Sequence, residues 1–156
     1  MDWTAIGSIA TAVAVFVAAW QVRSASRASR TGFEDALARE YRDIARAIPM
    51  AAHLNVDLVR EELAAALPAL FQYFDLSNQQ IFLRMNGRVG LITWREWCEG
   101  IRFNLSRKTF AAAWEHIKAQ DPHTFNELRR LESEHFTSDP FTWTSRWKHL
   151  KGALSV

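Results

Sequence analysis

The sequence predicts an all-α protein: one N-terminal transmembrane helix followed by a compact helical bundle at residues 31–138. Residues 3–22 form a mostly apolar run with no charged side chain. A helix of that length rises about 30 Å, the thickness of the hydrocarbon core of a bilayer. After this run, apolar residues recur at helical spacing between helix-capping signals. No segment alternates polar and apolar residues between hairpin turns, so nothing in the pattern predicts a sheet.

The segment that follows the apolar run is basic. It contains Arg23, Arg27 and Arg30, whereas no Lys or Arg precedes the run. The positive-inside rule therefore predicts an anchor at residues 1–23 with its N-terminus outside, a basic juxtamembrane segment at residues 24–30, and a cytoplasmic C-terminal domain. The missing basic n-region favours an uncleaved anchor over a signal peptide. The lipid bilayer is thus the first predicted partner.

Small residues recur within the apolar run at the spacing that lets two membrane helices approach closely. One interpretation is self-association of the chain into a homo-oligomer through the membrane. The other is that Ala and Gly are simply common in membrane helices. The candidate contact residues are Gly7, Ala10, Thr11, Ala14 and Ala18.

The charge distribution argues against a nucleic-acid-binding domain. The sequence pI is about 9.0, but after Arg30 the chain has equal numbers of basic and acidic residues. The excess positive charge is therefore juxtamembrane, where it suits anionic lipid better than a phosphate backbone. The single cysteine, Cys98, excludes an internal disulfide.

The first two helices of the predicted bundle have clear boundary signals. Thr31 and Glu34 form a capping box, and Pro49 ends the helix that it opens. A second helix begins near Asp57, and Pro68 is expected to kink or restart it.

The stretch around and beyond that proline carries a heptad-like apolar stripe with a single polar member. A glycine stop at Asn86–Gly87 ends it. The residues of the stripe are spaced by four and three: Leu67, Phe71, Phe74, Asn78, Ile81 and Met85.

Further helix starts follow along the chain. Thr93 opens a second capping box, Ser106 is placed to cap the next helix, and Asp121–Pro122 is a cap followed by proline at the first helical position. Asp139–Pro140 repeats this signal and opens an amphipathic segment at residues 139–156. The Trp residues of that segment either pack on the bundle or lie at the membrane surface.

No catalytic, cofactor-binding or metal-binding motif is present. The glycines form neither a P-loop nor a GxGxxG turn, and no two histidines have the spacing of a zinc-binding HExxH helix. His116 and His123 are interpreted as surface residues near a helix junction. Cys98 lacks a nearby base and is interpreted as a small core residue. The sequence therefore predicts a non-enzymatic protein without a cofactor.

An unusual cluster of polar residues lies in an otherwise apolar helix, with Asn78 in the stripe itself. The cluster consists of Asp75, Ser77, Asn78, Gln79 and Gln80. Three interpretations stay open: a device that sets oligomer register, a pocket for a small anionic ligand formed with nearby arginines, and an internal hydrogen-bonded network. The candidate ligand or interface residues are Asp75, Asn78, Arg84, Arg88, Arg95 and Arg102.

The stretch from Tyr73 to Leu83, continued through Gly87–Arg88 to Thr93–Trp97, resembles a set of small bacterial membrane proteins of unknown function. These have one N-terminal membrane helix and a helical cytoplasmic domain. The resemblance implies architecture and location at the bacterial inner membrane, and no activity.

Together these features predict a membrane-anchored, non-enzymatic helical module that self-associates or binds a protein partner at the inner membrane. The alternative is a ligand-gated membrane effector. In that case the cytoplasmic domain binds a small anionic, nucleotide-like signal, and the arginine side chains contact its phosphate.

Overall fold

The computed structural model describes residues 21 and 32–143, and every regular element in that part of the chain is a helix. The all-α prediction is therefore confirmed. The chain divides into two compact units, Met1–Leu37 and Ala38–Val156. Except for Gln21, the predicted anchor, the basic segment and the small-residue stripe all lie outside the described residues, as do residues 144–156. Among the described helices, none has the length and apolar character needed to cross a membrane.

The first described helix covers residues 32–47 and ends before Pro49, as predicted. A short helix that the sequence did not predict, α2 (Met50–His53), follows at once. The ring of His53 lies 3.0 Å from the carbonyl oxygen of Ala45 and ties α2 back to the helix before it.

The long helix α3 (Arg60–Met85) runs through Pro68 without a break, so the predicted kink or restart is wrong. A proline removes only one backbone hydrogen bond from a helix. Here Ala66 and Leu70 are buried on either side of it, and their packing holds the helix together across that position. The helix also starts later than predicted, where the Val59 N–H donates to the Glu62 carboxylate at 3.2 Å.

The glycine stop at the end of α3 is confirmed. Gly87 has a φ of +70°, a conformation that glycine adopts without a steric penalty. The Arg88 N–H donates to the Leu83 carbonyl at 2.9 Å and the Gly87 N–H to the Arg84 carbonyl at 3.0 Å. These two bonds make a Schellman motif.

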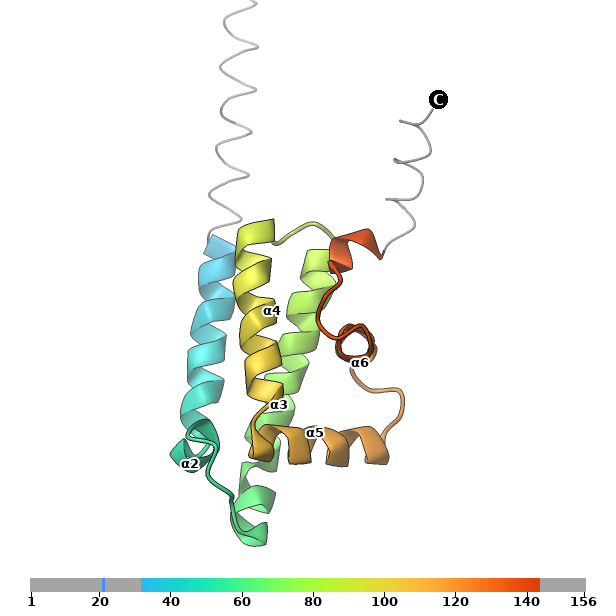
Figure 1. Ribbon diagram of the computed structural model, residues 1–156. Coiled ribbons are helices and arrows are strands. Elements are labelled where there is room, and N and C mark those ends of the chain that lie inside the picture. Colours follow the sequence, from blue (N-terminus) through green and yellow to red (C-terminus); the bar gives the residue numbers. More distant parts are fainter. Residues whose placement is uncertain (1–20, 22–31, 144–156) are drawn as a thin grey trace, which may run out of the picture. The chain divides into compact units, whose positions relative to one another are not determined.

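Helix α3 is the centre of the second unit and contacts α4, α5, α6 and η1 (Figure 1). It is therefore buried on several faces, which a single apolar stripe does not describe. Phe74 and Ile81 of the predicted stripe are fully buried, whereas Phe71 is 45% exposed. Tyr73 and Leu76, outside the stripe, are buried as well.

Helices α4 (Leu91–Leu105) and α5 (Lys108–Gln120) correct two predicted starts. Helix α4 already begins after Gly90, so Thr93 lies inside it and forms no capping box. Ser106 ends α4 and does not cap α5. Phe110 and Trp114 of α5 are fully buried, and α5 crosses the end of α4 (Figure 1).

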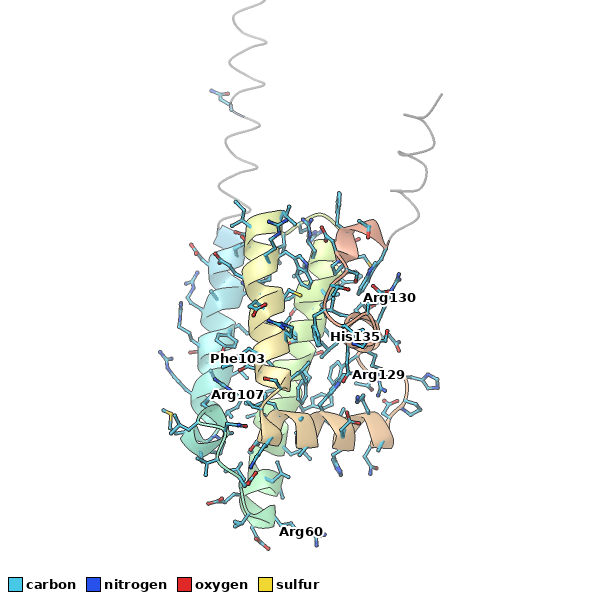
Figure 2. All side chains as sticks on the ribbon, in the orientation of Figure 1. Arg60, Phe103, Arg107, Arg129, Arg130 and His135 are labelled. Carbon is cyan, nitrogen blue, oxygen red and sulfur yellow. The ribbon has the colours of Figure 1, made fainter. Side chains whose placement is uncertain are left out.

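The Asp121–Pro122 signal makes a turn and not a helix start. The Asp121 carboxylate accepts from the backbone N–H of His123 at 2.9 Å, and α6 (Asn126–Ser133) begins only after Phe125. From α6, Arg129 reaches back to the carbonyl oxygen of Asp121 at 2.7 Å (Figure 2).

The second Asp-Pro signal is confirmed where it is described. Asp139 precedes the 3₁₀ helix η1 (Pro140–Thr142), and its carboxylate accepts from the Phe141 N–H at 3.0 Å. Whether the rest of the 139–156 segment packs on the bundle or on a membrane stays a prediction.

Candidate functional site

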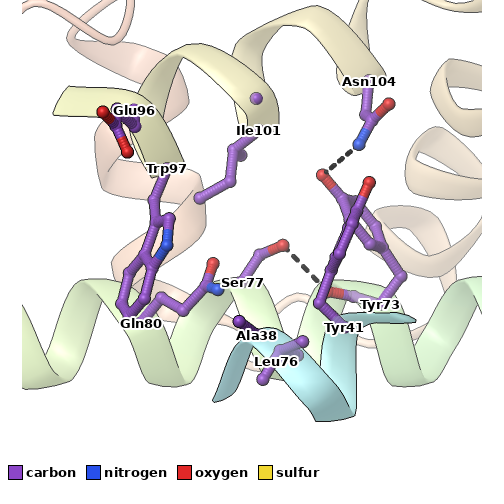
Figure 3. Close-up of a pocket in the computed structure, with 11 residues that line it drawn as sticks. Ala38, Tyr41, Tyr73, Leu76, Ser77, Gln80, Glu96, Trp97, Ile101 and Asn104 are labelled. Carbon is purple, nitrogen blue, oxygen red and sulfur yellow. Dashed lines mark hydrogen bonds between the residues drawn. The ribbon is translucent and has the colours of Figure 1, made fainter. Parts of the chain in front are cut away.

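A pocket of about 230 Å³ opens within the second unit, between α3, α4 and residues 38–41 of the first described helix (Figure 3). We call it the Gln80 pocket. Figure 3 shows Trp97 and Gln80 at one end and Tyr41, Tyr73 and Asn104 at the other. Its lining residues are Ala38, Tyr41, Tyr73, Leu76, Ser77, Gln80, Glu96, Trp97, Gly100, Ile101 and Asn104.

The Tyr end of the pocket is held rigidly. The Asn104 side-chain amide donates to the Tyr73 hydroxyl at 3.0 Å, and its oxygen accepts from Arg107 at 2.9 Å. Arg107 in turn lies over the ring of Phe103, 4.6 Å from the ring centroid (Figure 2). Burial raises the pKa of Tyr73 to about 12, against the opposing effect of the Asn104 hydrogen bond. Tyr73 is therefore a neutral phenol at physiological pH.

The rings of Tyr41 and Tyr73 meet edge to face, with centroids 6.3 Å apart. Aromatic rings in this arrangement attract each other beyond the area they bury. Tyr73 also makes edge contacts with Phe74 and Phe110. Tyr41 and Tyr73 thus form the part of the pocket wall that adjoins the aromatic core.

Gln80, like the Tyr41 hydroxyl, is a polar group of the lining for which the described residues provide no hydrogen bond. Its side chain is only 7% exposed, yet its amide makes no hydrogen bond with any residue that the structure describes, and it points into the pocket (Figure 3). Ser77, by contrast, donates to the Tyr73 carbonyl at 2.8 Å. Among the described residues, Trp114 Nε1 is the one fully buried side-chain polar atom without a hydrogen bond. The amide atoms of Gln80 therefore keep access to the open space of the pocket, where a water or a ligand can bind them.

Glu96 is the one charged residue among those that line the pocket. No Lys, Arg or His contributes to the lining, so the pocket is neutral to acidic. Trp97 is the third aromatic side chain in the lining and is partly exposed. The pocket therefore combines aromatic faces, a free amide and one carboxylate.

Arg84, a predicted ligand residue, is buried and hydrogen-bonded within the domain. Its guanidinium donates to both carboxylate oxygens of Asp139, at 2.8 and 2.5 Å, and to the Val89 carbonyl at 2.9 Å. Burial by itself raises the pKa of Asp139, but the hydrogen bonds from Arg84 and the Phe141 N–H outweigh burial and lower that pKa below its ordinary value. The pair attaches η1 to the end of α3.

Asn78, which is partly buried, is also hydrogen-bonded within the domain. Its amide donates to the Glu127 carboxylate at 2.9 Å, and its oxygen accepts from the Leu128 N–H at 3.0 Å. Leu128 lies in the first turn of α6, where backbone N–H groups lack partners within the helix. Asn78 of α3 therefore caps α6. This arrangement is an internal hydrogen-bonded network, the third of the interpretations given for the polar cluster.

The remaining candidates lie on the surface. Asp75, Arg88 and Arg95 are exposed. Arg102 is exposed as well and pairs with Glu99 of its own helix at 2.5 Å. The structure thus distributes the six predicted residues over several sites, and none of them lines the Gln80 pocket.

Cys98 is a buried residue of α4 whose thiol lies 3.7 Å from the Phe136 carbonyl. Burial raises its pKa to about 11, and the nearby Glu99 carboxylate acts in the same direction. A nucleophilic cysteine needs a lowered pKa, so the interpretation as a small core residue is confirmed. His116 and His123 are exposed, as predicted.

Sequence reasoning pointed to the correct stretch of α3 but to the wrong partners. Ser77 and Gln80 belong to the predicted polar cluster, whereas Tyr41, Trp97 and Asn104 were missed. One signal was available: Tyr73, Ser77 and Gln80 are spaced by four and three, which places three polar groups on one helix face.

Comparisons with models of known protein families, with curated proteins and with solved structures found no match to this chain.

Proposed function

We propose that this chain is a membrane-anchored, non-enzymatic helical interaction module, held at the bacterial inner membrane with its helical domain in the cytoplasm. The observation that carries the proposal is the charge-free run of residues 3–22, followed by Arg23, Arg27 and Arg30. Such a run is long enough to span a bilayer, and the arginines give it a direction. The resemblance to small bacterial membrane proteins points the same way.

The polar groups of the helical domain support a structural role over catalysis. Arg84 and Asn78 complete their hydrogen bonds within the domain. Within residues 32–143, no group of three His, Cys, Asp or Glu side chains has the geometry to hold a metal ion. The domain is thus best understood as a packed helical body that presents its surface to a partner.

The proposed assembly uses the small-residue stripe of the apolar run. In a helix, Gly7, Ala10, Ala14 and Ala18 share one face, and small side chains on it let a second copy approach closely. A homo-oligomer formed through this face would bring several helical domains together.

Two measurements on the full-length chain test this proposal. We expect the protein to stay in the membrane pellet after a carbonate wash, because a spanning helix is not released by loss of surface contacts. Crosslinking in membranes is expected to trap oligomers that Ala14→Leu abolishes, whereas Ala12→Leu, on the opposite side of a helix, leaves them intact. Release by carbonate would contradict the anchor, and equal crosslinking of both variants would contradict the stripe.

A second function, a ligand-gated membrane effector, is favoured by the Gln80 pocket. The pocket contacts three helices of one unit, so a ligand in it would bias how those helices pack. The predicted anionic ligand rests on the arginines alone, and no arginine lines this pocket. A thermal-shift screen of the full-length chain against nucleotides tests the anionic ligand, with Arg88→Ala, just beyond the C-terminal end of α3, compared with Arg60→Ala at its N-terminal end. Stabilisation that only Arg88→Ala removes would support an anion site.

A further inference from the structure

The size of the Gln80 pocket limits its ligand to a small molecule. Ligand sites for drug-sized molecules have volumes of about 300–1,000 Å³, and this pocket has about 230 Å³. A ligand of one ring with a short polar chain matches that space. Residues 38–104 supply all of the lining, so the inference holds whether or not the apolar run spans a membrane.

The charge of the lining selects the sign of the ligand. Glu96 is the one charged residue among the eleven that line the pocket. No arginine lines the pocket: Arg84 pairs with Asp139, and Arg107 lies beyond Asn104, to whose side-chain oxygen it donates. The charge of Arg107 acts at the Tyr end, where it tends to lower the pKa of Tyr73, so the place for a cation is the opposite end, at Glu96 and Trp97. Glu96 is an exposed residue, so its carboxylate lies at the mouth of the pocket. There it attracts a positive group and repels a negative one, although water weakens both effects.

The aromatic side chains favour the same sign. Tyr41, Tyr73 and Trp97 all contribute to the lining. The face of an aromatic ring attracts a cation, and Trp does so most strongly. The Tyr41–Tyr73 pair also supplies an apolar wall at the end of the pocket away from Trp97 (Figure 3).

Gln80 supplies the directional contact. Ser77 donates to the Tyr73 carbonyl, and Asn104 joins the Tyr73 hydroxyl to Arg107. Gln80, only 7% exposed, points its amide into the pocket beside the Trp97 end, where a cation is expected (Figure 3). Its carbonyl oxygen accepts hydrogen bonds, and an ammonium group offers only donors.

We propose that the Gln80 pocket binds a small organic cation, a primary amine or similar ammonium compound with an apolar or aromatic body. The ammonium group lies between the Glu96 carboxylate, the Trp97 ring and the Gln80 carbonyl oxygen. The body of the ligand lies against Tyr41 and Tyr73. Nothing in this arrangement requires a chemical step, so the site acts as a receptor.

Three probes of nearly the same shape and different charge test the sign of the ligand. They are phenethylamine, 2-phenylethanol and phenylacetate, titrated calorimetrically at pH 7 into the full-length chain in zwitterionic nanodiscs, with empty nanodiscs as the blank. We expect phenethylamine to bind about tenfold more tightly than the alcohol and phenylacetate to bind most weakly. If the chain proves not to insert in membranes, the same titration in lipid-free buffer tests this pocket separately from the anchor.

Two variants and one control identify the site. Glu96→Gln is expected to remove most of the preference for amine over alcohol, and Gln80→Met to weaken amine binding. Glu99→Gln removes an exposed carboxylate of the same helix that does not line the pocket, and it should leave the preference unchanged. Equal binding of amine and alcohol, tighter binding of phenylacetate, absence of binding by all three probes, or an amine preference that survives Glu96→Gln would overturn the proposal.

Discussion

Three polar side chains of α3, Asn78, Gln80 and Arg84, differ in how their hydrogen bonds are completed. Asn78 and Arg84 are joined to α6 and η1 through Glu127, Leu128 and Asp139. Gln80, between them in sequence, faces a pocket and finds no partner among the described residues. Asn78 and Arg84 attach α6 and η1 to α3, whereas the amide of Gln80 stays open for binding. The same helix therefore serves packing on one side and recognition on another.

The largest expected effect is the loss of the Arg84–Asp139 pair. Arg84→Met removes three hydrogen bonds and leaves the carboxylate of Asp139 without its cation. Because three hydrogen bonds are lost and the carboxylate of Asp139, whose side chain is 29% exposed, loses its cation, we expect the free energy of unfolding to fall by about 3 kcal/mol. Urea denaturation of the full-length chain, followed by circular dichroism, measures it.

The control for this variant is Arg102→Met, which breaks the exposed pair with Glu99. Exposed pairs contribute little to stability, so the urea midpoint should stay close to that of the wild type. Equal losses in the two variants would show that the burial of Arg84 does not explain how much the Arg84–Asp139 pair contributes to stability.

Loss of the Asn78 cap is the next largest effect. Asn78→Leu leaves the Leu128 N–H and the Glu127 carboxylate without their partner. We expect a loss of about 2 kcal/mol, since a stranded polar group costs its desolvation. Hydrogen exchange should also accelerate at the Leu128 amide. The exposed neighbour Gln79 serves as control, and Gln79→Ala should change neither quantity; unchanged exchange in Asn78→Leu would rule out capping.

Two glycines give effects of opposite sign. Gly87 has a φ of +70°, and an added Cβ would lie 3.1 Å from the Phe141 ring. Gly87→Ala should therefore lower the free energy of unfolding by about 1 kcal/mol. Gly100 lies within α4 with nothing within 4 Å of an added Cβ, so Gly100→Ala should raise it by a similar amount, about 0.5–1 kcal/mol. Thermal unfolding measures both effects, and a change of Tm in the same direction in the two variants would contradict the prediction.

The sequence was sufficient where the signals are local. Gly87 ends α3, Pro49 follows the end of the first described helix and Asp139 caps η1, as predicted. Each of these depends on residues only a few positions apart. Four local signals failed. Tertiary packing overrides Pro68, and α4 starts earlier than Thr93, after Gly90. Ser106 ends α4 and does not cap α5, and Asp121–Pro122 makes a turn before α6.

The candidate site was harder to predict because its contacts are distant in sequence. The bond from the Leu128 N–H to Asn78 joins residues fifty positions apart, and no local pattern marks it. Asn78 and Gln80 also looked like one cluster, although residues two apart on a helix point about 200° apart. Helical geometry thus sends one to α6 and the other to the pocket.

The smallest expected effect on stability is that of Gln80→Met, and it tests most directly how Gln80 differs from Asn78. Gln80→Met keeps the length of the side chain and removes an amide for which the described structure provides no partner. Because no hydrogen bond is lost and apolar surface is gained, the free energy of unfolding should stay within about 0.5 kcal/mol of the wild-type value or rise. A loss as large as that of Asn78→Leu, in the same urea denaturation, would mean that Gln80 has a structural partner. Stability that is maintained while amine binding weakens would mean that this amide is kept for the ligand and not for the fold.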